Sequence, residues 1–313
     1  MSDVGSMVRS ACARVAARAR HVSVEREAIP AYAAGLPPAA PQPAPDPQAH
    51  LIAGTEEELA AFWLTLDAIN FGSGWFPTLR KRAGRSGYYT VAIGLRERFA
   101  TAGPWPAREL AAIGPDEVAR VLGQDSEHEL MALFARSLND LGRHVACDHG
   151  GRFRAVVDGA GGSAMALVEL IAGWECFADV SSYDGFTVPF YKRAQIAAAD
   201  LADAGVVRWH DGERLTMFAD NLVPHVLRLD GMLRFAPDLL ARINDGELIE
   251  HGSPEEVEIR ACALHAVELI VSARAGGPDG SVSAAGVDRL LWQRGGGPGY
   301  KSSPRHRSRC TAY

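Results

Sequence analysis

The stretch "GTEEELAAFWLTLDAINF" (54–71) decides the fold class, because it carries both a helix start and a buried helical face. Thr55 can cap a helix, and three glutamates follow it, which suits the positive end of the helix dipole. Apolar residues then recur at helical spacing: Leu59, Phe62, Trp63, Leu66 and Ile69. We therefore expect a core helix here.

Helical patterns continue along most of the chain, whereas strand signals are few. We expect further helices at 88–100, 107–112, 115–122, 127–142, 163–178, 190–204, 217–229, 236–244, 255–274 and 282–293. The best strand candidates are "RFRAVVD" (152–158) and "GVVRWHDGERLTM" (205–217), the second resembling a hairpin that turns at Asp211-Gly212. The sequence therefore predicts a mainly α fold with a small β element.

The two ends of the chain differ in composition from the middle. "MVRSACARVAARARHVSV" (7–24) resembles a transit peptide, but Arg and Ala are good helix formers and we expect a plain helix. The proline-rich stretch 30–47 predicts an extended connector. We expect residues 1–47 to pack on a single helical domain, 48–313. Composition alone predicts a disordered tail for the glycine-rich, basic stretch 295–313.

Charge and composition exclude several classes of protein. The formal charge of -6 argues against binding nucleic acid through a broad basic field, and the five scattered cysteines form no C-x-x-C pair. No apolar stretch approaches the roughly 20 residues that span a bilayer, so we expect a soluble cytoplasmic protein. The sequence also lacks the G-x-S-x-G, P-loop, H-E-x-x-H and dinucleotide-binding templates.

Two carboxylates interrupt apolar helical patterns. Asp220 lies inside "LTMFADNLVPH" (215–225), and Asp288 interrupts an apolar set near the C-terminus. A buried acid must be paired, neutralised or used, so a helix cap or a salt bridge is one interpretation of each. Two such acids, with aromatic residues such as Trp75 nearby in the pattern, also suit a pocket for a flat polar heterocycle.

Cations stand at a predicted helix start in "SYDGFTVPFYKRAQIAAAD" (182–200). Asp184-Gly185 predicts a turn, Pro189 suits a helix start, and Lys192 and Arg193 then fall in its first turns. Cations at the positive end of a helix are locally unfavourable, which suggests a bound anion. A solvated helix start is the alternative.

The predicted helix "SPEEVEIRACALHAVELI" (253–270) carries several polar residues with structural interpretations. Ser253 and Glu256 predict a capping box, and Arg260 is spaced for an i, i+4 pair with Glu256. His265 is on the apolar side, which indicates a core histidine rather than a catalyst.

Four segments together resemble a known family: "LDAINF" (66–71), "PFYKRAQI" (189–196), "LTMFADNLVPH" (215–225) and "EVEIRA" (256–261). The family is the queuosine salvage proteins, which are queuosine 5'-phosphate N-glycosylases. The ending "LLWQRGGGPGYKSSPRHRSRCTAY" (290–313) is similar as well, so the resemblance covers most of the chain after the connector. It implies that the tail belongs to the folded body.

The resemblance implies a helical core similar to the helix-hairpin-helix DNA glycosylases, acting on a free nucleotide. The reaction is hydrolysis of the N-glycosidic bond of queuosine 5'-phosphate, which releases queuine and ribose 5-phosphate. No metal or organic cofactor is implied. We expect a monomer whose partner is this small nucleotide, with no direct contact to nucleic acid or membrane.

The resemblance also implies roles for individual residues. Breaking the glycosidic bond builds positive charge on the ribose, and Asp220 is the candidate that stabilises this charge or attacks C1'. Asp288 is the candidate for recognising the guanine-like edge of the base, which lacks the N7 that ordinary purines can protonate.

Further contacts to the substrate are expected from residues around these acids. Lys192, in the family's KRAQ motif, is the expected ligand of the 5'-phosphate, with His50 as a second candidate. Phe71 and Phe218 would contact the rings. Asp184 is a weaker candidate, because Asp-Gly is a common turn.

Departures from the family pattern leave alternatives open. The residues 221–225 after the FAD motif and the stretch "NFGSGWF" (70–76) differ from the usual family residues, which affects fine substrate preference. One alternative is a non-catalytic nucleotide- or RNA-binding helical module, suggested by "KSSPRHRSR" (301–309). Another is a glycosylase for a different purine-like nucleotide.

Overall fold

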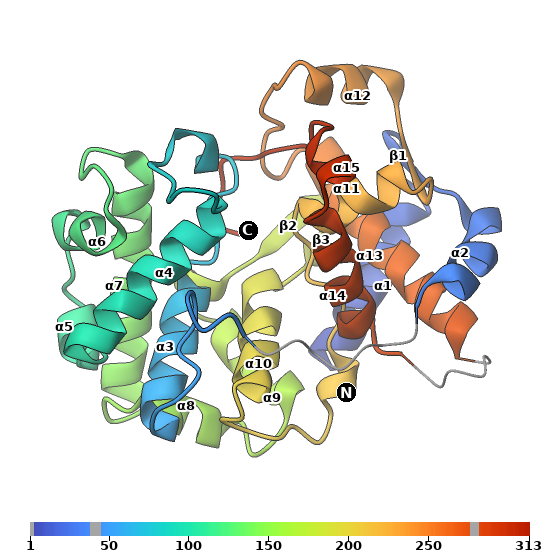
Figure 1. Ribbon diagram of the computed structural model, residues 1–313. Helices are drawn as coiled ribbons and strands as arrows, with labels where there is room; N and C mark the ends of the chain where they lie inside the picture. Colours follow the sequence, from blue (N-terminus) through green and yellow to red (C-terminus); the bar gives the residue numbers. More distant parts are fainter. Residues whose placement is uncertain (1–2, 38–44, 276–281) are drawn as a thin grey trace.

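The computed structural model describes residues 3–37, 45–275 and 282–313, and within these ranges the chain is mainly helical (Figure 1). The first nine helices are α1 (Val4–Ala16), α2 (Ile29–Gly35), α3 (Glu56–Ala68), α4 (Gly87–Ala102), α5 (Ala107–Leu110), α6 (Pro115–Leu122), α7 (Glu129–Asp148), α8 (Phe153–Gly159) and α9 (Ala164–Ala172). The remaining helices are α10 (Lys192–Asp203), α11 (Leu222–Leu229), α12 (Pro237–Asn244), α13 (Pro254–Arg274), α14 (Ala284–Gly295) and α15 (Pro298–Lys301).

The described residues contain two small antiparallel sheets of two strands each, which confirms the predicted mainly α class. One sheet pairs β1 (Val22–Val24) with β4 (Leu233–Phe235), and the other is the hairpin of β2 (Val180–Tyr183) and β3 (Phe186–Pro189). The hairpin turns at Asp184 and Gly185, which both have positive φ as a tight two-residue turn requires. The turn predicted at Asp184-Gly185 is therefore confirmed.

Helix α3 is the centre of the first group of helices, on the left of Figure 1. Every residue from Leu59 to Ala68 is buried, since α4, α7, α8 and α10 all pack against this helix. Its start is the predicted one: Thr55 accepts the N–H of Glu58, and the Glu58 carboxylate accepts the N–H of Thr55. The core helix expected from the opening stretch is confirmed.

Helix α13 is the centre of the second group, on the right of Figure 1, where α1, α2, α11 and α14 surround it. Ser253 caps α13 as predicted, but the Glu256 carboxylate accepts the N–H of Gly252 instead of closing a capping box with Ser253. The predicted Glu256–Arg260 pair is present at 3.5 Å. His265 is half-buried and lies 2.8 Å from the Arg26 guanidinium.

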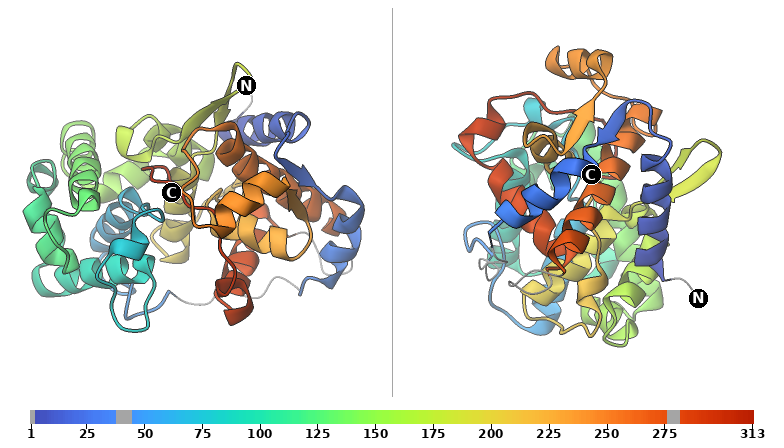
Figure 2. Two further views of the ribbon diagram at one scale, coloured as in Figure 1. Left: turned by 90° about the horizontal axis from the view of Figure 1, so that it is seen from above. Right: turned by 90° about the vertical axis from the view of Figure 1, so that its right-hand side faces the viewer.

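The C-terminus lies between the two groups of helices (Figures 1 and 2). Cys310, Ala312 and Tyr313 are buried, and the N–H of Gly72 donates to the carbonyl of Tyr313 at 3.1 Å. Disorder predicted from composition is therefore wrong for this tail, and the folded tail implied by the resemblance is confirmed. The residues that alternate with its last arginines, His306, Ser308 and Cys310, are buried together with Ala312 and Tyr313.

Both predicted strands are wrong. Residues 152–158 form α8, because a short apolar run suits a buried helix as well as a strand. Residues 205–217 contain only a short 3-10 helix, Gly212–Arg214. The Asp211 carboxylate accepts hydrogen bonds from Ala164 N and Ser163 Oγ at the start of α9, so it anchors that helix instead of turning a hairpin.

Several predicted helix boundaries also shift. The helix expected over 163–178 ends at Ala172, since Trp174 takes an extended backbone and stacks on His144 at 4.6 Å. The helix expected from 217 begins at Leu222. Pro189 ends β3 instead of starting a helix, and α10 begins three residues later.

The predicted N-terminal helix is confirmed as α1, but the stretch 30–47 is not wholly extended. Pro30 lies in the first turn of α2, where its missing N–H is not needed, and the helix runs to Gly35. The rest of the expected connector falls partly on residues 38–44, outside the described residues. The expected division at residue 47 stays a prediction, although α1 packs on α13.

No single helix in the described ranges is long and apolar enough to cross a membrane. Only α8 and α9 taken together reach that length and composition, and they are bent by 118° at their junction.

Candidate active site

Asp220 is half-buried at the start of α11, between the two groups of helices. Its Oδ1 accepts hydrogen bonds from Leu222 N at 2.8 Å and Val223 N at 3.1 Å, so the carboxylate caps the helix. It forms no ion pair with any residue that the structure describes. One oxygen is therefore fixed by backbone donors, and the other, Oδ2, is available for a substrate.

The extended segment before Asp220 is held by side chains of α10 and α13. Gln195 of α10 accepts the N–H of Thr216 at 2.8 Å and donates to its hydroxyl at 2.8 Å. Arg260 of α13 donates through Nε to the carbonyl of Ala219 at 2.9 Å. These bonds occupy the backbone groups that an earlier start of α11 would need, and they fix the position of Asp220.

A buried ion network connects this segment to α10. The Arg260 guanidinium is fully buried and lies 2.6 Å from the Asp179 carboxylate, which also accepts the backbone N–H of Lys192 at 3.0 Å. Burial opposes the charge of Arg260, but Asp179 and Glu256 raise its pKa above the ordinary value. One arginine thus positions both Ala219 and Lys192.

Lys192 is buried in the first turn of α10, next to Asp220. Its Nζ donates to the carbonyl of Asn70 at 3.0 Å. Burial lowers the pKa of Lys192, while the charges of Asp220 and Asp67 oppose this shift. Tyr191, the residue before it, has a left-handed backbone with φ of 51°, which is unusual for a side chain of this size. The ammonium is therefore held among carboxylates on a strained helix start.

Asp288 lies on α14 and is 4% exposed. Its Oδ1 accepts the N–H of Phe218 at 3.0 Å. Burial raises the pKa of Asp288 well above its ordinary value, and the charge of Asp220 adds to this effect. Burial therefore favours the neutral form of Asp288, in which the carboxyl group can both donate and accept a hydrogen bond.

The structure thus brings together four of the predicted site residues: Asp220, Lys192, Asp288 and Phe218. His50 lies to one side, where its ring stacks on Trp63 at 5.0 Å and its Nε2 is 2.9 Å from the Tyr88 hydroxyl. Burial lowers the pKa of His50 to about 4, so the imidazole is neutral.

Two predicted site residues lie elsewhere. Phe71 is 1% exposed and packs edge-to-face on Phe134 at 5.0 Å, so its ring belongs to the core. Asp184 is exposed at the tip of the β2–β3 hairpin and forms an ion pair with Arg20 at 2.7 Å. Among the described residues, neither side chain contacts Asp220, Lys192, Asp288 or Phe218.

Arg305 of the C-terminal tail is a site residue that the sequence reasoning missed. Burial lowers the pKa of Arg305, and the neighbouring charge of Asp220 opposes this shift. Its guanidinium has no hydrogen-bond or ion-pair partner among the described residues. The only sequence signal for Arg305 was the basic run 305–309, which suggested RNA binding. Arg305 was missed as a site residue because the path of the tail back to Asp220 cannot be read from the sequence.

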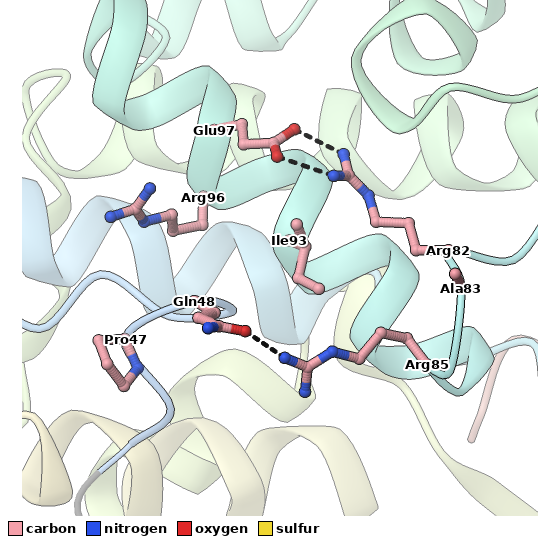
Figure 3. A pocket seen from close by; sticks show the side chains of 8 residues that line it. All are labelled: Pro47, Gln48, Arg82, Ala83, Arg85, Ile93, Arg96 and Glu97. Carbon is pink, nitrogen blue, oxygen red and sulfur yellow. Dashed lines mark hydrogen bonds and ion pairs between the residues drawn. The ribbon is translucent and has the colours of Figure 1, made fainter.

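A pocket of about 470 Å³ lies apart from this group, between the segment around Pro47 and helix α4 (Figure 3). Much of its polar lining is already paired, since Arg82 binds Glu97 and Arg85 binds Gln48. No residue of the Asp220 group lines it. Within the described parts of the chain, no group of three or more His, Cys, Asp or Glu side chains is placed to hold a metal ion.

Known proteins are similar to this chain over most of its length. The family model described as queuosine salvage protein matches residues 50–313. A protein from Sphaerobacter thermophilus, named queuosine 5'-phosphate N-glycosylase/hydrolase, is 39% identical over 268 residues, which cover 82% of each chain. A protein of the same name from Bos taurus is 29% identical, and the match covers 83% of each chain. One from Dictyostelium discoideum is 30% identical, and the match covers 82% of this chain and 79% of the relative. The chain belongs to the queuosine salvage protein family.

Proposed function

We propose that this chain hydrolyses the N-glycosidic bond of queuosine 5'-phosphate and releases queuine and ribose 5-phosphate. Relatives that match over most of their length carry the name of this activity. The observation that carries the proposal to this chain is the environment of Asp220. It is a half-buried carboxylate, oriented by two backbone amides and free of ion pairs within the described residues. It lies next to a lysine and to Asp288, whose neutral form is favoured by burial.

Asp220 is suited to the charge that develops in this reaction. As the C1'–N9 bond breaks, the ribose becomes an oxocarbenium-like cation and the bonding electrons leave with the base. The Oδ2 oxygen of Asp220, placed beneath the sugar, stabilises this cation better than mobile water could. A water oxygen then bonds to C1', and the proton it loses balances the charge of the departing base.

Asp288 is suited to the base. A neutral carboxyl group donates one hydrogen bond and accepts another, which matches a carbonyl next to a ring N–H on the guanine-like edge. Negative charge grows on the base as it departs, and a neutral donor stabilises that charge where a second carboxylate would repel it. We expect the ring of Phe218, whose backbone N–H binds Asp288, to contact the base.

Two cations are candidates for the 5'-phosphate. Lys192, the residue expected from sequence, already donates to Asn70 and lies among carboxylates that disfavour an anion. Arg305 lies near Asp220 and its guanidinium has no partner among the described residues, and arginine binds phosphate through two parallel hydrogen bonds. We therefore include Arg305 in the proposed phosphate site with Lys192, while His50 and Phe71 stay further candidates for substrate contact.

We further propose that the enzyme acts as a cytoplasmic monomer on the free nucleotide, without binding nucleic acid or membrane directly. The formal charge of -6 and the free cysteines support this. Sedimentation at micromolar concentration should give the mass of one chain, and a dimer would contradict the monomer.

The direct test is to incubate the protein with queuosine 5'-phosphate and to measure queuine by liquid chromatography and mass spectrometry. We expect release by the wild type and a loss of at least about 100-fold in kcat for Asp220→Asn, because the charge that stabilises the transition state is gone. Asparagine still caps a helix, so the fold is retained.

Asp3→Asn is the matched control, since Asp3 also caps a helix, α1, and among the described residues its side chain contacts Ser6 and Arg214 instead of the Asp220 group. It should keep wild-type turnover. No queuine from the wild type would overturn the proposed function, whereas near-normal turnover of Asp220→Asn would overturn only the role of Asp220. Equal rates with guanosine 5'-phosphate would point to a general purine nucleotide glycosylase.

A further inference from the structure

Three buried polar atoms next to the Asp220 group have no hydrogen-bond partner in the described chain: His50 Nδ1, Trp63 Nε1 and Asp67 Oδ2. Their side chains are 8%, 3% and 0% exposed. An unpaired polar atom in such a position costs about 1–3 kcal/mol, so three of them together call for a ligand or for bound water.

These atoms belong to one neighbourhood. Trp63 and Asp67 are four residues apart on α3 and share a face of that helix. The His50 ring stacks on Trp63 and contacts the hydroxyl of Tyr88. Tyr88 in turn lies close enough to Asp67 and Asp200 for both carboxylates to raise the pKa of its phenol, after the larger effect of burial.

Asp200 completes this neighbourhood from α10. It lies about two turns after Lys192, on the side of α10 that packs against α3. The side chain is half-buried, so it keeps access to water although protein surrounds it. We call His50, Trp63, Asp67, Tyr88 and Asp200 together the acidic recess.

The charges around the acidic recess define what it can bind. Burial raises the pKa of Asp67 to about 7, opposed by the Asn70 hydrogen bond and by Lys192 and Arg193. Burial also raises the pKa of Asp200, with Asp67 and Asp203 adding to the shift and Arg289 and Lys192 opposing it. Arg289 is itself paired with Asp203 at 2.9 Å. A bound cation would stabilise the ionised forms of these two acids, whereas a phosphate would repel them, so the acidic recess favours a cation that carries hydroxyl groups.

Queuine has such a group. Its 7-substituent is a methylene-linked secondary amine, protonated at neutral pH, that carries a cyclopentene ring with a cis-diol. Carboxylates bind both ammonium groups and vicinal hydroxyls, and an indole N–H can donate to a hydroxyl oxygen. No other part of queuosine 5'-phosphate combines a positive charge with hydroxyl groups.

We infer that the acidic recess binds the amino-cyclopentenediol arm of queuine, with Asp200 facing the ammonium and Asp67 and Trp63 facing the diol. Lys192 is adjacent to both Asp220 and Asp67, so the recess adjoins the place proposed for the scissile bond. The arm is thus recognised on the α3 side of Lys192, while the phosphate lies toward Arg305. This inference rests on the proposed function for the identity of the ligand.

The test compares the affinities of two free bases, queuine and 7-deazaguanine, by isothermal titration calorimetry on the full chain. 7-Deazaguanine has the same ring system without the arm. Asp200→Asn should lower the affinity for queuine about tenfold or more, because a charge-assisted bond to the arm is lost. The affinity for 7-deazaguanine should change less than about twofold. Asp67→Asn should act in the same direction, and Asp158→Asn, an exposed helical aspartate on α8, should change neither affinity.

The outcomes separate the two proposals. Unchanged queuine affinity in both variants, or an equal loss for both bases, overturns the assignment of the recess. A selective loss of affinity for queuine supports the assignment. If Asp67→Asn fails to fold, a selective loss in Asp200→Asn alone is sufficient. Release of queuine from the nucleotide by the wild type is measured separately, so failure of the proposed hydrolysis is recognised whatever the binding data show.

Discussion

At the scale of single residues, carboxyl groups in this protein differ by what surrounds them. Asp220 receives two backbone N–H groups and stays open to a substrate, whereas Asp288 and Asp67 are buried with little compensation. Burial accordingly raises the pKa of Asp288 and Asp67. Chemically identical side chains thereby suit different roles.

The protonation of Asp67 should make stability depend on pH. The pKa of Asp67 is raised from 3.8 to about 7 in the folded protein, so the folded state binds more protons than the unfolded state between these values. Stability from this residue is therefore highest at low pH and falls as pH rises through that window. Between pH 5 and pH 8, we expect the free energy of unfolding of the wild type to fall by about 2 kcal/mol more than that of Asp67→Asn, as measured by urea denaturation. Parallel pH profiles would contradict the buried, protonated acid.

The phosphate site can be divided between its two cations by one comparison. Arg305→Ala should lower kcat/KM for queuosine 5'-phosphate about tenfold or more and leave the nucleoside queuosine nearly unchanged, because only the nucleotide carries the anion. Lys192→Ala should affect both substrates if its main role is to balance Asp220 and Asp67. Equal losses on both substrates for Arg305→Ala would remove it from the phosphate site.

At the scale of elements, helix α13 organises the site through buried polar side chains. Its residues Glu256, Glu258 and Arg260 are buried, and the last two hold segments that are distant in sequence. The Glu258 carboxylate accepts the N–H groups of residues 20–22 and the Tyr183 hydroxyl, and Arg260 binds Asp179 and Ala219. The family-like segment "EVEIRA" is therefore a set of structural anchors.

Arg260→Met should show how strongly this anchoring matters. The variant leaves Asp179 and Glu256 buried without their cation, so we expect a loss of about 3–5 kcal/mol in the free energy of unfolding. Arg242→Met, which breaks exposed pairs with Glu247 and Glu255, should cost less than about 1 kcal/mol. Urea denaturation of both variants checks this, and similar losses would show that the buried network does not stabilise the fold.

At the scale of the whole molecule, the C-terminal tail joins the two groups of helices. The Tyr313 ring lies 4.6 Å from the Arg260 guanidinium in the second group, and its carbonyl accepts the N–H of Gly72 beside the first. The same tail carries Arg305 toward Asp220. Stability and substrate binding should therefore depend on the last residues of the chain.

Deleting residues 310–313 should lower both properties together. The deletion exposes Arg260 and removes a contact between the groups, so we expect Tm to fall by at least about 5 °C and kcat/KM to fall at least about tenfold. Thermal unfolding and the queuine assay measure these changes. Lys301→Ala, at an exposed position in the same tail, is the control and should behave as the wild type. A deletion variant with wild-type Tm would show that the tail does not join the groups.

Local features of the sequence predicted most helices, because caps and apolar spacing act between residues within about four positions of each other. Thr55 with Glu58 at the start of α3 and Asp184-Gly185 in the hairpin are such features, and both are present as predicted. The strands could not be found in this way. Val22 pairs with Phe235, and a strand as short as β1 exists only because that distant partner supplies its hydrogen bonds.

For the site, the sequence by itself determined the residue types, through the segments that carry Asp220, Lys192 and Asp288. Only the tertiary structure decided which of them meet, that burial favours the neutral forms of Asp288 and Asp67, and that Arg305 lies near Asp220. The physical reason is that burial and electrostatic fields are sums over the whole surroundings of a group. Those surroundings come from helices far apart along the chain, whereas a helix start is set by its own neighbours.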